Sequence, residues 1–120
     1  MCKYEFTGRT RVIDNVVVRQ IRRIEDGLIG GYIEKEENLS QFGKCFVYDN
    51  AIVRGNAKVL CDAEIRDNCK VLMNAIVKDS AVLRDNVVVY DNAEIRDNVM
   101  MIGRARARGN CVIGGSAKVG

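Results

Sequence analysis

A six-residue repeat runs unbroken from Phe46 to Ala117 and limits the possible folds more than any other feature of the chain. Counted from Ala51 in steps of six, one position holds a small residue at all twelve steps. The position two residues later holds a larger aliphatic residue or Met, except at Ala107. An Asp or Gly and then an Asn usually precede the small residue, so the consensus is Asp/Gly-Asn-Ala-x-Val-x. The small positions are Ala51, Ala57, Ala63, Cys69, Ala75, Ala81, Val87, Ala93, Val99, Ala105, Cys111 and Ala117, and the large positions are Val53, Val59, Ile65, Val71, Val77, Leu83, Val89, Ile95, Met101, Ala107, Ile113 and Val119.

This period predicts short strands joined by corners. Ala-x-Val places two side chains on one face of a strand, whereas a helix requires apolar residues three and four apart. Asp-Asn and Gly-Asn favour corners, because Asn and Gly tolerate a positive φ and Asp and Asn hydrogen-bond their own backbone in turns. One short strand cannot bury its apolar face alone, but stacked coils bury a continuous core. The sequence therefore predicts a β-solenoid.

The repeat resembles that of the hexapeptide-repeat family of left-handed parallel β-helices, the group that contains the sugar and lipid A acyltransferases. The resemblance covers about residues 45–119. It implies three hexapeptides per coil, a left-handed winding and a trimer whose prisms pack side to side. The expected fold is therefore all-β: a single-stranded left-handed parallel β-helix of about four coils, preceded by an N-terminal β-hairpin cap.

Residues 1–44 lack the repeat, and we interpret them as a cap over the first coil of a β-helix spanning 45–120, the two forming one folding unit. Residues 10–13 and 16–24 are predicted strands around an Asp14-Asn15 turn, and 34–39 a single helical turn. The segment from Gly30 to Cys45 resembles the lead-in of uncharacterised, often phage-borne hexapeptide proteins. Those proteins are labelled acyltransferases from their fold alone, which conveys no mechanism.

The chain has no His, which excludes much of the usual catalytic chemistry. Acyltransferases of the family use a His as general base, and its carbonic anhydrases hold zinc with three His, so neither site can be carried over. We therefore expect no catalytic residue and no cofactor. The alternative is an acyltransferase that uses CoA or an acyl carrier with Glu64 or Glu94 as base, although both lie at outward strand positions where charged residues are expected.

Five Cys and the charge balance bear on location and partners. Cys45, Cys69 and Cys111 lie in the small inward column, where a thiol acts as an apolar filler, and an odd number of thiols is typical of a reducing compartment. No apolar run approaches the ~20 residues of a membrane helix and no signal peptide opens the chain. The net charge of +3 is too small to indicate a nucleic-acid binder. We expect a cytoplasmic protein with neither membrane nor nucleic acid as partner.

Two clusters of charge are candidate ligand sites. With three sides per coil, Asp49, Asp67 and Asp85 stack along one edge, about 5 Å apart. Either Ca²⁺ compensates their repulsion, or each carboxylate accepts N–H bonds of its corner and faces water. The second cluster contains Arg104, Arg106 and Arg108, and it could bind an anion such as phosphate, a carrier cofactor or an acidic partner; the alternatives are a solvated face and pairing with Asp91.

Apolar residues at outward positions predict an interface. Contiguous exposed apolar surface commonly marks one, so we expect a homo-oligomer, with a trimer as the first expectation. The chain stops at Gly120 with no covering helix, so a longer parent was cut there or the end stacks on a partner in an end-to-end dimer. One candidate face carries Ile52, Leu72, Val88 and Tyr90, and a second carries Val82, Met100 and Ile102.

Three functions are compatible with these features. The leading hypothesis is a non-catalytic β-solenoid scaffold or interaction module that oligomerises. The alternatives are an acyltransferase resembling its better-known relatives and an anion-binding module that uses the Arg cluster. An enzyme needs a cleft with a titratable base, whereas a scaffold needs only a flat, closed interface.

Overall fold

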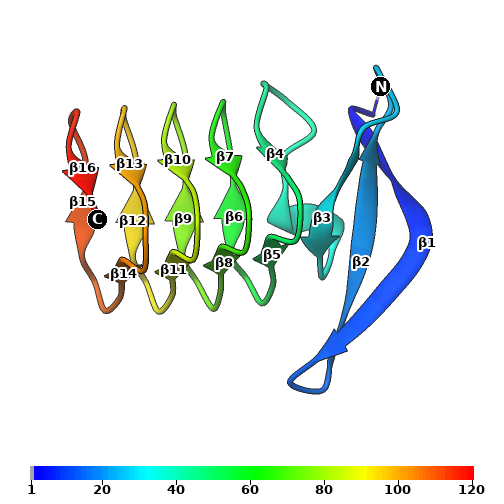
Figure 1. The fold of residues 1–120 in the computed structure, drawn as a ribbon, viewed down its shortest axis with the longest axis horizontal. Coiled ribbons are helices and arrows are strands. Elements are labelled where there is room, and N and C mark those ends of the chain that lie inside the picture. Colours follow the sequence, from blue (N-terminus) through cyan, green and yellow to red (C-terminus); the bar gives the residue numbers. More distant parts are fainter. Residues whose placement is uncertain (1) are drawn as a thin grey trace.

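The computed structural model describes residues 2–120, which form a β-solenoid of stacked turns with a long hairpin at its N-terminal end (Figure 1). Two long strands form the hairpin, one 3₁₀ turn follows, and short strands of two residues fill the repeat. The elements are β1 (Tyr4–Ile13), β2 (Val16–Arg23), β3 (Ile29–Ile33), η1 (Glu36–Asn38), β4 (Phe46–Val47), β5 (Ile52–Val53), β6 (Lys58–Val59), β7 (Glu64–Ile65), β8 (Lys70–Val71), β9 (Ile76–Val77), β10 (Val82–Leu83), β11 (Val88–Val89), β12 (Glu94–Ile95), β13 (Met100–Met101), β14 (Arg106–Ala107), β15 (Val112–Ile113) and β16 (Lys118–Val119).

Three sheets form the walls of the solenoid. The hairpin sheet is 7-stranded, in the order β1-β2-β3-β5-β8-β11-β14. The β10 sheet is 5-stranded (β16-β13-β10-β7-β4), and the β9 sheet is 4-stranded (β15-β12-β9-β6). All pairs among the strands β3 to β16 are parallel. Each residue pairs with the one in the same position one turn later, as Val53 does with Val71 and Leu83 does with Met101. The predicted all-β solenoid with three strands per turn is therefore confirmed.

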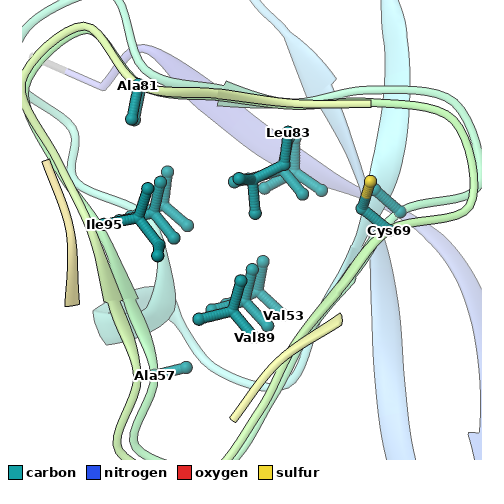
Figure 2. Packing of buried hydrophobic residues seen from close by; sticks show 14 of the residues in the cluster. Val53, Ala57, Cys69, Ala81, Leu83, Val89 and Ile95 are labelled. Carbon is teal, nitrogen blue, oxygen red and sulfur yellow. The ribbon is translucent and has the colours of Figure 1, made fainter. Parts of the chain in front are cut away.

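The two repeat columns point together into the prism, as predicted. Figure 2 shows Val53, Leu83, Val89 and Ile95 clustered at its centre, with Ala81 beside a wall. In the small column every side chain from Ala51 to Val99 is fully buried, as is every large one from Val53 to Met101. Burial decreases in the last turn, where fewer neighbours cover the inward side chains. Because these residues replace water contacts by packing, they supply the main stabilisation of the fold.

The solenoid contains one turn more than the repeat predicts. Strand β3 pairs in parallel with β5, and Leu39 forms a parallel bridge with Val59, so residues 29–45 follow the same path as the turns after them. The stack therefore has about five turns, and the first of them lies in the segment that we interpreted from the sequence as a cap. A Cβ on Gly31 would lie 2.9 Å from Val47 Cγ1. Glycine is needed here because the neighbouring turn leaves no room for a side chain, and not because the backbone has a positive φ.

The predicted hairpin is confirmed, and its turn explains its register. Asp14 and Asn15 have φ values of 51° and 64°, the conformation that a two-residue hairpin turn requires. β2 pairs antiparallel with β3 and so extends the hairpin sheet past the first turn. Val18 is fully buried against Tyr32 and Ile52, which attaches the hairpin to the outside of the solenoid.

Each corner turns on the first residue of its Asp-Asn or Gly-Asn pair. The positive φ lies at Asp or Gly, for example 56° at Asp67 and 69° at Gly103, whereas the Asn that follows is not in that region. The sequence predicts this conformation for Asn and Gly; in these corners it occurs at Gly and at Asp, and not at Asn. Two residues that rarely adopt a positive φ occupy the same position, Cys61 and Met73, both at 61°. These two corners are therefore strained relative to the others.

Candidate functional site

Most of the candidate interface residues lie where the sequence places them. The hairpin sheet carries Leu72 and Tyr90 one turn apart, with Val88 beside them on β11, and all three are half-buried. Ile52 shares this face but is only 4% exposed, because the hairpin covers it through Val18 and Tyr32. Ile52 therefore offers very little surface to a second chain, unlike the other candidates on this face.

The β10 sheet presents the second predicted group. Val82 pairs with Met100 on the neighbouring strand, so their side chains are stacked one turn apart on the outer face. Ile102 follows Met101 at the next outward position. All three are half-buried. They form a continuous apolar strip, which we name the β10 strip (Val82, Met100, Ile102).

The Arg cluster is divided between a strand and a corner. Arg106 lies on β14 and Arg108 directly after it, so both lie on the outer face of the hairpin sheet, whereas Arg104 lies in the preceding corner. All three side chains are exposed. Within residues 2–120 no carboxylate forms an ion pair with any of them. The pairing with Asp91 that the sequence offers as one alternative is not present among the described residues, and Asp91 Oδ2 instead accepts the N–H of Gly109 at 3.0 Å.

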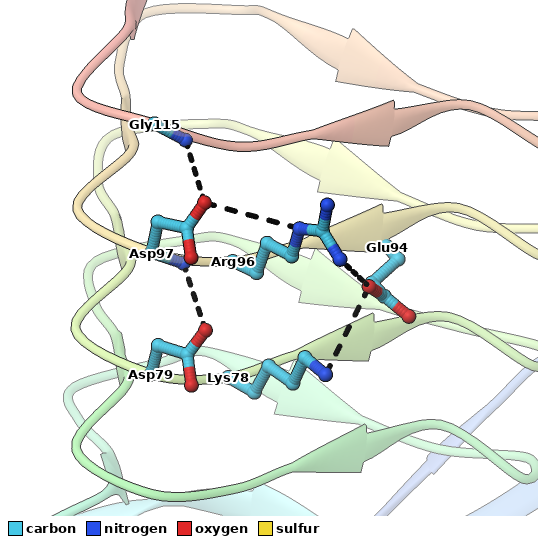
Figure 3. Close-up of polar contacts among 6 residues, drawn as sticks. All are labelled: Lys78, Asp79, Glu94, Arg96, Asp97 and Gly115. Carbon is cyan, nitrogen blue, oxygen red and sulfur yellow. Dashed lines mark hydrogen bonds and ion pairs between the residues drawn. The ribbon is translucent and has the colours of Figure 1, made fainter.

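The stacked corner carboxylates bond the backbone of the next turn. Oδ2 of Asp49 accepts the N–H of Asp67 at 3.1 Å, and Oδ2 of Asp67 accepts the N–H of Asp85 at 2.9 Å. Figure 3 shows the same ladder at another edge, where Asp97 accepts the N–H of Gly115. In the part of the chain that the structure describes, no group of three acidic or Cys side chains could hold a metal ion. The carboxylates that the sequence offered to Ca²⁺ are thus used by corner N–H groups.

Met73→Asp is expected to stabilise the protein. Met73 has a positive φ, which Asp tolerates better, and its side chain is 52% exposed. In the ladder a carboxylate at this position would accept the N–H of Asp91, one turn further on, as Asp67 accepts that of Asp85. Relief of strain and the new bond together contribute about 1 kcal/mol, or roughly 3–6 °C in melting temperature.

The control for this variant is Met73→Ala, which keeps the strained backbone and offers no acceptor. Thermal denaturation followed by circular dichroism compares the three proteins. We expect the Ala variant to melt at or below the wild-type temperature. Equal melting temperatures for Met73→Asp and Met73→Ala would show that the ladder contributes nothing at this corner.

The two carboxylates considered as catalytic bases are engaged in ion pairs. Oε1 of Glu64 lies 2.6 Å from Nη2 of Arg66. Oε2 of Glu94 lies 3.5 Å from Nη1 of Arg96 and 3.9 Å from Nζ of Lys78, as Figure 3 shows. Both carboxylates therefore lie on the outer surface beside cations, at the outward strand positions where the sequence expects charged residues.

Two of the three inward thiols, those of Cys45 and Cys69, are protected from reaction by burial. Desolvation raises the pKa of Cys69 to about 11, and it also raises the pKa of Cys45, where nearby Lys3 opposes the effect. The thiolate is the reactive form, so both thiols stay protonated near neutral pH. This agrees with the prediction that they fill space in the core.

Sequence reasoning missed several exposed apolar side chains outside the repeat. Phe42 is 84% exposed in the connection before β4, and Val12 and Val17 on the hairpin are 69% and 49% exposed. Phe42 lies between Gln41 and Gly43, outside the repeat, so no periodicity assigned it to a face. The alternation of β2 could have identified Val17 as the outward neighbour of buried Val18.

No family model matches this sequence, and no curated protein matches it. Within residues 2–120 no helix combines the length and apolar character needed to cross a bilayer. The assignment of function therefore depends on the surfaces described above.

Proposed function

We propose that this protein is a non-catalytic β-solenoid scaffold that self-associates through the β10 strip. The observation that supports the proposal is the continuous stacking of Val82, Met100 and Ile102 on one outer face. Each is half-buried within the single chain, and packing against a second chain would remove the remaining apolar surface from water. A trimer is the assembly we favour.

We also propose that the chain is a member of the hexapeptide-repeat family of left-handed β-helices. The unbroken Asp/Gly-Asn-Ala-x-Val-x repeat and the three parallel sheets support this relationship. Membership would account for a side-to-side trimer. It would also leave the protein without the family's His-dependent chemistry, because the sequence has no His.

Charge favours the β10 sheet over the hairpin sheet as the self-association face. Lys70, Arg106 and Arg108 all project from the hairpin sheet and have no carboxylate partner within residues 2–120. Three copies packed with this face toward a three-fold axis would bring like charges together, which opposes association. The outer face of the β10 sheet also carries two exposed cations without a carboxylate partner among the described residues, Arg84 and Lys118, but it carries an acidic residue too, Glu64, so like-charge repulsion is weaker there.

The test measures mass in solution by light scattering. We expect the wild type to have about three times the chain mass of 13.4 kDa. Met100→Glu introduces a charge into the β10 strip and is expected to give a monomer that is still folded, with a native circular-dichroism spectrum and a cooperative melt. The matched control is Ile76→Glu, which alters a half-buried apolar residue on the β9 sheet and should leave the trimer intact.

Each alternative gives a different result. A wild-type monomer at high concentration would refute self-association. A trimer that Met100→Glu leaves intact while Leu72→Glu dissociates it would transfer the interface to the hairpin sheet. A dimer that is insensitive to every side-face variant would instead support end-to-end stacking.

A further inference from the structure

A groove separates the hairpin from the first turns of the solenoid. It has a volume of about 560 Å³ and lies on the outer face of the hairpin sheet. Its apolar surface comes from Tyr32 and Ile52, both nearly buried, and from Ile13 on the hairpin. The polar lining residues are Arg11, Asn50, Asn68 and Lys70.

Two cations from different elements line this groove, and neither has a counter-ion. Arg11 comes from β1 and Lys70 from β8, two strands that are not adjacent in the sheet. Within residues 2–120 no carboxylate lies at ion-pair distance from either one, whereas nearby Arg54 is paired with Asp14 at 2.9 Å. The two positive charges therefore remain available to an external anion.

The cation on the hairpin is held in position before any ligand binds. The guanidinium carbon of Arg11 lies 5.2 Å from the centre of the Tyr32 ring. Tyr32 is itself fixed by packing against Val18 and Ile52. A guanidinium stacked on a buried ring loses less conformational freedom when it binds an anion, so the site is partly preorganised.

The two amides add neutral donors. Asn50 and Asn68 occupy equivalent corners one turn apart, and their backbones are joined by the ladder of that edge. In the described part of the chain neither side-chain amide is hydrogen-bonded to another residue, unlike the Asn56–Asn74 and Asn92–Asn110 pairs of another edge. The Oδ2 atoms of the adjacent Asp49 and Asp67 already accept backbone N–H groups.

The number and kind of donors select the ligand. The guanidinium, the ammonium and two amides together supply more N–H groups than the two oxygens of a carboxylate can accept. A phosphate monoester carries three terminal oxygens and close to two negative charges, and Arg binds it in a bidentate manner. We propose that this groove binds a phosphoryl group, with Arg11 and Lys70 compensating its charge and Asn50 and Asn68 donating to its oxygens.

This site is different from the Arg cluster of β14. Arg106 and Arg108 lie beyond β11, and neither lines the groove. The hairpin lies at the N-terminal end of the solenoid and does not reach β14 (Figure 1). The groove gives an anion contacts from two sides, and the cluster from one only. Binding in the groove would therefore be weakened by substitutions of Arg11 and Lys70, and binding at the cluster by substitutions of Arg106 and Arg108.

The experiment titrates inorganic phosphate into the full chain at low ionic strength and follows amide resonances by NMR. We expect the side-chain amide signals of Asn50 and Asn68 to shift together. Arg11→Gln and Lys70→Gln should each weaken binding about tenfold or more, since each removes a charge-assisted hydrogen bond. The matched controls Arg106→Gln and Arg108→Gln should change the affinity less than twofold.

Further arms identify the source of the phosphoryl group. Glycerol phosphate represents a small-molecule monoester, and a phosphoserine peptide represents a phosphorylated protein partner. The probe that binds with the higher affinity identifies which of the two supplies the phosphoryl group. Acetate should bind more weakly than phosphate. If Arg11→Gln loosens the hairpin, as a melting curve would show, Lys70→Gln alone decides, because Lys70 is exposed on β8. Binding that depends on Arg106 and Arg108, or no shift at Asn50 and Asn68, would overturn the proposal.

Discussion

Ile65→Lys is expected to leave the chain unfolded at room temperature. Ile65 is fully buried on β7, between Val47 and Leu83 of the neighbouring turns. A lysine at this site would place an unpaired ammonium in the apolar prism, which costs several kcal/mol in addition to the ~1.5–3 kcal/mol of lost packing. That sum is comparable with the ~5–15 kcal/mol that stabilises a typical domain. Circular dichroism should show neither the native spectrum nor a cooperative melt.

The matched control introduces the same residue one position earlier. Glu64 points outward from the same strand and is paired with Arg66, so Glu64→Lys loses a surface ion pair worth about 1 kcal/mol at most. We expect this variant to fold and to melt within a few degrees of the wild type. Similar melting curves for the two variants would mean that the repeat columns do not face a dry core.

Asn38→Leu is expected to destabilise the protein by about 3–5 kcal/mol, because it leaves several buried polar groups without partners. Asn38 is fully buried at the end of η1. Its Oδ1 accepts the N–H groups of Glu34 and Lys35, at 3.1 and 2.9 Å. Its Nδ2 donates to the carbonyls of Gly55 and Ala57, at 3.1 and 2.8 Å. This one side chain thus joins the first turn of the solenoid to the second.

Urea denaturation of Asn38→Leu measures this loss, with Asn56→Leu as the control. Asn56 is an exposed corner residue whose amide contacts Lys35 and Asn74, so its replacement should change the free energy of unfolding by less than ~1 kcal/mol. If the two variants have equal stability, the bonds of Asn38 are no stronger than those it makes with water in the unfolded chain.

The solenoid could be predicted from the sequence because the same local pattern recurs in twelve successive hexapeptides. Ala51 and Val53 already define an inward pair, and every later pair repeats it, so local and global preferences agree. The first turn could not be predicted in this way. Its close packing relies on Gly31, and its hydrogen bonds rely on Asn38, each of which occurs once and follows no period.

The candidate surfaces were predicted less completely than the core, because they depend on what the hairpin covers. Alternation places Ile52 outside the prism, and only the three-dimensional position of Val18 shows that it is buried. Arg11 and Lys70 are 59 positions apart in the sequence, and no motif connects them. They come together because β2 and β3 join the hairpin to the parallel strands, which is a feature of topology and not of spacing.

The regular spacing of the later turns has a consequence for how the chain folds. From the second turn onward, the ladder bonds from one corner to the next span 18 residues, so each added turn closes a loop of the same length and meets the same entropic cost. The β1–β2 hairpin, closed by a two-residue turn, is the cheapest element to form and exposes an edge on which β3 can be laid down. Winding can then advance from that seed toward the C-terminus, the direction in which a ribosome delivers the chain.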